Sequence, residues 1–229
     1  MMIDIHTHLL PFVDDGVRDY DEAIQIINDL SKQGVNDIFI TPHYYKLRNY
    51  LSSPEENKQI FDTLKSKLDM NDIRLYLANE IKYTKDTLKD IEDKRVLALF
   101  KNFYLVEFST DISVYELSEA IFNMIVKKYI PIIAHVERYE NLNKIEDVKD
   151  FKKMGALIQV NATSLLGSRG LRTKKWIKKL IKEDLVDFVS SDSHRIHENL
   201  MKDAYQYLEK KFSKECAEKL MNNQIVIQA

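Results

Sequence analysis

The chain has 229 residues, of which 45% are hydrophobic and 31% charged, and its 5 glycines and 4 prolines are too few for a disordered or low-complexity protein. Its 34 basic and 36 acidic side chains give a formal charge of −2, which provides no electrostatic basis for general nucleic-acid binding. The single cysteine excludes an intramolecular disulfide framework, and no leader pattern or run of ~18 apolar residues is present, so we expect a cytoplasmic protein without stable membrane insertion.

Short apolar segments rich in β-branched residues alternate along the chain with longer segments of helical period. This alternation is typical of βα units built around a parallel sheet. The predicted strands are, in chain order, Ile3–His6, Asp37–Thr41, Arg74–Asn79, Tyr104–Phe108, Pro131–His135, Ala156–Asn161 and Asp187–Ser191.

The intervening helices have recognisable ends. Asp19 and Ser53 stand where N-caps are expected, and Gly34 and Gly155 stand where helices should stop. Within Asp21–Gln33 the apolar residues recur at three- and four-residue spacing, which predicts one buried face. No Gly/Ser/Pro-rich linker and no repeat divides the chain. The sequence therefore favours one α/β barrel-like domain over residues 1–229 rather than an open doubly wound sheet.

Polar residues gather where the predicted strands end, and enzymes with barrel architecture build their sites at the carboxyl ends of strands. These residues are His6 and His8, His43, Glu80, Glu107, His135, Asn161, and Asp192 with His194. They include five of the six histidines. The sixth, His197, is predicted to be solvated.

Any one of these residues taken alone could be structural. Together they would place unpaired carboxylates and imidazoles on one rim, at a cost of several kcal/mol unless a cation is bound. Imidazole with carboxylate, and without thiolate, suits manganese, iron or zinc better than calcium or magnesium. Asp15, in an Asp-Asp-Gly loop after the first strand, could add a carboxylate, although the loop could also be a plain Asp-Gly turn.

The motifs at these positions, read in order, resemble those of the polymerase and histidinol phosphatase (PHP) superfamily. Within it they are most similar to the bacterial protein-tyrosine phosphatases of capsule and exopolysaccharide operons, the CpsB/YwqE type. The motifs that carry the resemblance are Asp4-Ile5-His6-Thr7-His8, Asp14-Asp15-Gly16, Thr41-Pro42-His43, Glu80-Ile81, Glu107-Phe108, His135-Val136-Glu137-Arg138, Gln159-Val160-Asn161 and Ser191-Asp192-Ser193-His194.

The resemblance implies a distorted (β/α)7 TIM-like barrel, the PHP fold, with three bound metal ions, manganese before iron or zinc. It also implies that Arg138 contacts the phosphate, and that the substrate is the phosphotyrosine tail of a cognate bacterial tyrosine kinase. The implied ligands are His6, His8, Glu80 and Asp192 for one ion, Glu80, Glu107 and His135 for a second, and Asp15, His43 and His194 for the third.

Two points stay open in this assignment. Relatives carry a second phosphate-binding arginine some residues after the last histidine, whereas here Arg195 follows His194 directly and is only a candidate for that role. The acid that protonates the leaving group is not identified, because His43 or His194 could serve only by giving up metal coordination. The oligomeric state is not predicted.

Other functions are compatible with parts of this pattern to different degrees. A cysteine-dependent phosphatase is disfavoured because its loop needs an arginine six positions after the nucleophile, and Asn222 stands there after Cys216. A small phosphomonoester such as histidinol phosphate could be the substrate. Amidohydrolase chemistry is disfavoured because no convincing bridging lysine stands at a predicted strand end. A non-catalytic metal-binding module that docks on a kinase also remains, and the basic segment Arg169–Lys182 could hold an acidic tail or be a solvated helix face.

Overall fold

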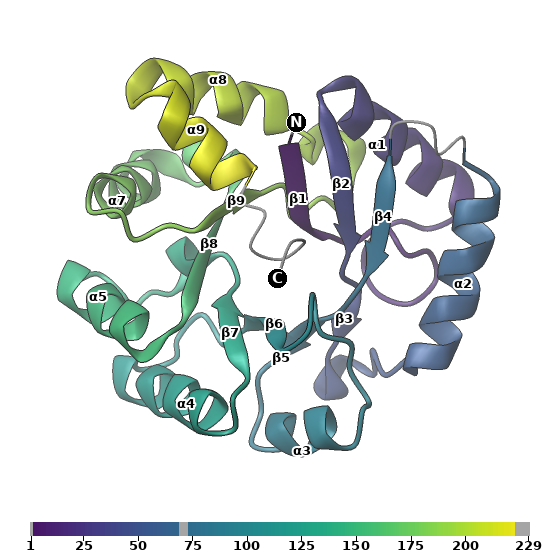
Figure 1. Cartoon of the computed structure of the whole chain (residues 1–229), viewed down its shortest axis with the longest axis horizontal. Helices are drawn as coiled ribbons and strands as arrows, with labels where there is room; N and C mark the ends of the chain where they lie inside the picture. The colour runs from purple at the N-terminus through teal and green to yellow at the C-terminus, as the bar shows by residue number, and fades with distance from the viewer. Residues whose placement is uncertain (1, 69–72, 223–229) are drawn as a thin grey trace.

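A computed structural model describes residues 2–68 and 73–222. Within these residues the chain forms a mixed α/β fold with its strands toward the middle and its helices on the outside (Figure 1). The prediction of a single domain over residues 1–229 also covers residues 1, 69–72 and 223–229, which lie outside the described residues. In the described part, no helix is both long enough and apolar enough to cross a membrane.

All strand pairs in the two sheets are parallel, as the βα alternation predicted. One sheet has the order β1-β2-β4 and the other the order β3-β5-β6-β7-β8-β9. The strands are β1 (Met2–Thr7), β2 (Val35–Ile40), β3 (His43–Tyr44), β4 (Arg74–Leu77), β5 (Glu80–Lys82), β6 (Phe103–Glu107), β7 (Ile130–Ile133), β8 (Leu157–Asn161) and β9 (Phe188–Ser190).

The first and last strands lie side by side at their carboxyl ends. Thr7 and Ser193 form an isolated parallel bridge, and the amide of His8 donates to the carbonyl of Ser193 over 2.9 Å. The amide of Asp192 donates to the carbonyl of His6 over the same distance. These bonds bring the two ends of the strand series together, while closure of the sheets into a seven-stranded barrel stays a prediction.

Each predicted strand overlaps an observed one, but two short strands, β3 and β5, were not predicted. They resume the direction of β2 and β4 after a break. Pro42 has no N–H for the ladder, and the side chain of Asn79 donates to the Pro42 carbonyl over 3.0 Å, so the pairing is interrupted there and restarts at His43 and Glu80. The breaks place these two residues at the start of new strand segments, directed into the rim.

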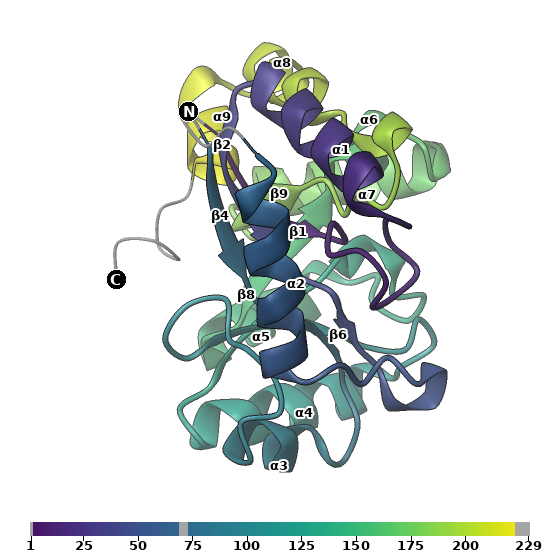
Figure 2. The same cartoon turned by 90° about the vertical axis from the view of Figure 1, so that its right-hand side faces the viewer.

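The helix ends follow the predicted signals. The Asp19 side chain caps α1 at Glu22, Ser53 forms a capping box with Glu56, and Gly155 ends α5 in the left-handed conformation with φ of 104°. Helices α1 and α2 lie against β2 and β4 (Figure 2). The helices are α1 (Tyr20–Lys32), α2 (Pro54–Ser66), α3 (Thr87–Glu92), α4 (Val114–Val126), α5 (Ile145–Met154), α6 (Ala162–Leu166), α7 (Gly170–Lys182), α8 (Met201–Lys211) and α9 (Lys214–Met221), with short 3-10 turns η1 (Lys46–Arg48), η2 (Val136–Arg138) and η3 (Ile196–Glu198).

The core has two parts. The larger cluster packs the helices onto the strands, and the smaller one joins side chains such as Ile5, Phe39, Leu105, Ile132 and Phe188 from strands of both sheets. Because the smaller cluster crosses from one sheet to the other, the strand ends are held in fixed positions relative to one another.

Candidate metal centre

Four side chains from three parts of the chain converge at the carboxyl end of β1. The Nε2 atoms of His6 and His8 are 3.2 Å apart, and each lies 3.2 Å from Glu80 Oε2. Asp192 Oδ1 lies 3.3 Å from His6 Nε2 and 3.4 Å from His8 Nε2. Tetrahedral ligands at about 2.0–2.2 Å from a metal ion are roughly 3.3–3.6 Å from one another. The four atoms therefore have the spacing of a metal-ion ligand set.

The orientation of His8 is set by a residue that the sequence reasoning did not assign. His8 Nδ1 lies 2.8 Å from Asp14 Oδ2, and a carboxylate only accepts, so Nδ1 carries the proton and Nε2 is free to bind a cation. Burial alone would raise the pKa of Asp14, but the neighbouring charge of His8 lowers it to about 2. Asp14 also accepts from the amides of His43 and Gly16 over 2.8 and 2.9 Å.

Gly16 lets this loop lie directly on His8. A Cβ at position 16 would stand 2.1 Å from the His8 carbonyl oxygen and 2.7 Å from its Cβ, so no larger residue fits. The Asp14-Asp15-Gly16 motif is thus more than a turn, because its first member orients a rim histidine and its glycine allows the approach.

His6 is oriented by a relay of amides that begins at Asp192. Since Asp192 Oδ2 only accepts, Asn161 must present Nδ2 to it, at 2.7 Å, and its Oδ1 therefore accepts from Gln159 Nε2 over 2.9 Å. Gln159 Oε1 then faces the His135 amide at 2.6 Å and His6 Nδ1 at 3.4 Å. The proton of His6 is placed on Nδ1, which again leaves Nε2 toward the cluster.

Glu80 joins the first ligand set to a second one. Its Oε1 lies 3.0 Å from His135 Nε2, which is 3.7 Å from Glu107 Oε1. The side chain of Glu80 is 1% exposed, so both of its oxygens are committed to the cluster. A carboxylate that faces two groups of ligands through different oxygens has the placement of a bridging ligand.

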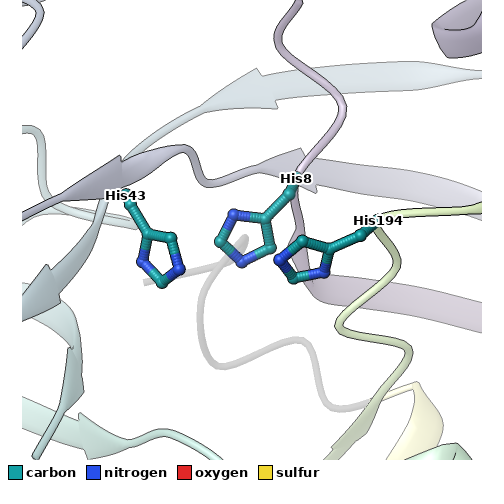
Figure 3. A group of neighbouring side chains, drawn as sticks. All are labelled: His8, His43 and His194. Atoms are coloured by element: carbon teal, nitrogen blue, oxygen red, sulfur yellow. The ribbon is translucent and has the colours of Figure 1, made fainter. Parts of the chain in front are cut away.

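A third group lies on the outer side of the cluster. His43 Nε2 and His194 Nε2 lie 3.7 and 3.8 Å from Asp15 Oδ1, and Figure 3 shows the His8 ring between the two outer histidines. The His194 Nδ1 atom lies 3.0 Å from the Asp192 carbonyl, which directs Nε2 outward. Asp15 is less confined than the other ligands, because it is partly exposed and its second oxygen pairs with Arg48 at 3.0 Å.

Two of the rim residues have backbone angles that non-glycine residues rarely adopt. His135 has φ of 33° and Asp192 has φ of 54°. Such conformations cost about 1–3 kcal/mol each and are common at functional sites. Here they turn each side chain inward directly after a strand or loop that approaches the cluster from outside.

The donor set fits metal ions on the evidence of the structure itself. Burial would raise the pKa of Glu80 and Asp192, but the charge of His6 keeps both well below the usual range, so two anions are buried together. The ligand atoms of His6, His8 and Glu80 all lie within 4.8 Å of one another. His43 Nδ1 is 3.0 Å from Glu80 Oε2 yet, among the described residues, has no well-aligned hydrogen bond. Cations would remove this mismatch.

The proposed phosphate-binding arginine lies beside the cluster. Arg138 Nη2 donates to Asp192 Oδ2. Its side chain is 27% exposed, and it lines the same open cavity, of about 410 Å³, as His43, Glu107 and Asp192. Arg138 is thus positioned to serve both a metal ligand and a ligand in the cavity.

The other sequence candidates lie farther from the cluster. The Arg195 guanidinium donates to the carbonyls of Gly16 and His194, so in this structure it ties two loops together. His197 is exposed, as expected for a solvated residue. Cys216 lies half-buried in α9 against the core, where burial raises the pKa of its thiol and disfavours a nucleophilic thiolate.

Comparisons with known proteins agree with this geometry. The profile of the family described as capsular polysaccharide synthesis, CpsB/CapC, matches residues 2–227. The chain is 31% identical to the tyrosine-protein phosphatase CpsB of Streptococcus agalactiae, over 96% of this chain and 94% of the relative. It is 30% identical to the tyrosine-protein phosphatase YwqE of Bacillus subtilis, over 98% and 93%.

A solved structure is also similar. It comes from the crystal structures of YwqE from Bacillus subtilis and CpsB from Streptococcus pneumoniae, which are described as metal-dependent tyrosine phosphatases. The TM-score is 0.86 at 28% sequence identity, and the match covers 94% of this chain and 90% of the other. The similarity thus extends over nearly the whole fold.

Proposed function

The chain belongs to the CpsB/CapC family of capsular polysaccharide synthesis, and from this premise we propose that it is a metal-dependent protein-tyrosine phosphatase. The observation that carries the proposal is the set formed by His6, His8, Glu80 and Asp192, in which each histidine Nε2 lies 3.2–3.4 Å from one oxygen of Glu80 and one of Asp192. The relatives named as tyrosine-protein phosphatases supply the reaction class.

The proposed site holds three divalent or transition-metal ions, with manganese before iron or zinc. One is held by His6, His8, Glu80 and Asp192, the second by Glu80, Glu107 and His135, and the third by Asp15, His43 and His194. When bound, such ions supply positive charge that offsets a phosphate dianion and lowers the pKa of nearby water. The ligand mixture of imidazole and carboxylate supports these metals.

The remaining roles belong to side chains of the cavity. Arg138 would bind the phosphoryl oxygens through two directed N–H groups, exchanging part of its contact with Asp192 for the substrate. His43 and His194, which are the more exposed histidines of the cluster, are the candidates to hold the proton that the tyrosyl oxygen receives, and either would have to give up its metal coordination to do so. Phenoxide is a tolerable leaving group, so this proton transfer contributes less than charge neutralisation.

The proposed substrate is a phosphotyrosine in the tail of a cognate bacterial tyrosine kinase, in the cytoplasm. The half-buried, unpaired Cys216 fits a reducing compartment. The proposed architecture is a distorted (β/α)7 barrel, which the hydrogen bonds between the ends of β1 and β9 support. A barrel would explain why ligands from both ends of the chain meet at one rim.

The decisive experiment measures metal content and hydrolysis of a phosphotyrosine peptide in the same preparation, with added manganese, iron, zinc or magnesium. We expect turnover that a chelator abolishes and that Cys216→Ser leaves nearly unchanged. Hydrolysis of histidinol phosphate with no action on the peptide would assign a small-molecule substrate instead. Bound metal without turnover of any phosphomonoester would indicate a non-catalytic docking module.

A further inference from the structure

A second, larger cavity adjoins the metal site. It is an open groove of about 950 Å³ between η2 and α7, two elements that lie against each other. Arg138 lines both this groove and the metal cavity, so the two open spaces are adjacent at this residue. A chain that places a phosphate at the metals can therefore extend into the groove.

The groove is basic although the protein as a whole is slightly acidic. Five cationic side chains line it, including Arg169, Arg172 and Lys175, against the two carboxylates of Glu137 and Glu140. Of these two, Glu137 is buried and its Oε1 accepts a hydrogen bond from the amide of Asn161. The net charge presented by the groove is positive.

Three of the groove cations also lack ion-pair partners among the described residues. Across residues 2–68 and 73–222, none of Arg169, Arg172 and Lys175 has a carboxylate oxygen within 4 Å. Lysines of the neighbouring helix α5 behave differently, since Lys149 pairs with Glu183 at 2.7 Å and Lys153 with Asp150 at 2.7 Å. Unpaired cations in a concave surface are free to bind an anionic partner.

Among the described residues, a buried polar atom of a residue that lines the groove also lacks a partner. The indole Nε1 of Trp176 is buried and, in the part of the chain that the structure describes, has no hydrogen-bond partner. Trp176 is also the single tryptophan of the chain, so its fluorescence reports on this groove alone.

We propose that the groove between η2 and α7 binds carboxylate-bearing residues that flank the phosphotyrosine of the protein substrate. Arg172 and Lys175 pair with the acidic side chains, and Trp176 lies in the groove wall beside them. This inference rests on the proposed function, because the groove selects which phosphotyrosine reaches the metals. The specificity of the enzyme then includes residues outside the metal site.

Two double variants with equal charge change test the proposal. Arg172→Gln/Lys175→Gln removes two charges that line the groove, and Lys178→Gln/Lys182→Gln removes two from the same helix outside it. The measured quantity is the ratio of kcat/KM for a phosphotyrosine peptide with flanking Asp and Glu to that for the matched Asn and Gln peptide. We expect the groove variant to lower this ratio roughly three- to tenfold, and the control variant to retain it. An equal ratio in wild type and groove variant would overturn the proposal.

A binding measurement separates this proposal from the proposed function. An unphosphorylated acidic peptide should change the Trp176 fluorescence of the metal-loaded protein, and the change should weaken with added salt. If this signal is present but no phosphotyrosine peptide is hydrolysed, the proposed reaction fails and the groove stands. If hydrolysis is present but neither the signal nor the peptide preference is, the groove proposal fails. Tighter binding of a single-stranded RNA of equal length than of the acidic peptide would also overturn it.

Discussion

Two buried carboxylates in this protein are neutralised in different ways. Asp37, which is 2% exposed, receives two hydrogen bonds of 2.6 Å from the Nε and Nη2 atoms of Arg74, and one of 3.0 Å from the hydroxyl of Tyr76. Glu80, which is 1% exposed, is surrounded by four imidazoles within 3.2 Å of its oxygens, those of His6, His8, His43 and His135. Both carboxylates are equally hidden from water.

The difference lies in the source of the positive charge. Arg74 keeps its charge at any pH that the protein meets, and its hydrogen bonds to Asp37 raise the pKa of its guanidinium further. Imidazoles can lose their protons and become metal ligands, which a guanidinium cannot. The structural carboxylate of Asp37 is thus neutralised by a cationic side chain of the protein. The carboxylate of Glu80 lies instead among imidazoles that can bind metal ions from solution.

The largest effect is expected where the rim ligands are removed. Glu80→Ala and Asp192→Ala should each lose at least one bound ion and lower turnover by several orders of magnitude, because the remaining imidazoles no longer define a ligand set. Elemental analysis alongside aryl phosphate hydrolysis measures both effects. Full metal occupancy in either variant would show that the ligand assignment is wrong.

A smaller loss is expected when only the orientation of a ligand is disturbed. Asp14→Asn keeps the size of the side chain but no longer requires His8 to carry its proton on Nδ1. Loss of such a hydrogen-bond partner typically weakens metal affinity about 10- to 100-fold. Metal titration with a competing chelator measures it, and added metal should restore activity. An unchanged affinity would remove Asp14 from the support of the site.

Arg138 combines features of the two regions. It pairs with a buried carboxylate, that of Asp192, and it also lines the open cavity. Arg138→Lys keeps the charge but loses the planar two-point geometry, so kcat/KM for a phosphotyrosine peptide should fall about 10- to 100-fold, as expected for one charge-assisted contact of ~1.5–3 kcal/mol. Metal content and melting temperature should stay near those of the wild type. Wild-type turnover in this variant would leave phosphate binding to the metals alone.

The opposite pattern is expected at Asp37. Arg74→Met leaves a buried carboxylate that still accepts from the hydroxyl of Tyr76, and should lower the free energy of unfolding by about 1–3 kcal/mol without changing metal content. Urea denaturation measures the loss. The double variant Asp37→Asn/Arg74→Met should be more stable than Arg74→Met, because no unpaired charge remains. A loss of bound metal in Arg74→Met would contradict the separation of the two regions.

The sequence alone determined those features, such as strands and helix caps, that have short-range signals. Apolar runs located every main strand within a few residues, and the cap at Ser53 was predictable because its partner, Glu56, is three residues away. The convergence of these polar side chains was also predictable, because polar residues that follow parallel strands must meet at one edge of the fold. The family resemblance then grouped them by ion.

The tertiary structure decided what each ligand faces and what holds it there. His6 is oriented by Gln159, 153 positions later in the chain, and Arg138 by Asp192, 54 positions later. The groove beside α7 exists only because η2 is folded against that helix. No local pattern encodes such contacts, since side-chain partners distant in sequence are brought within hydrogen-bond reach only by the packing of the strands that carry them.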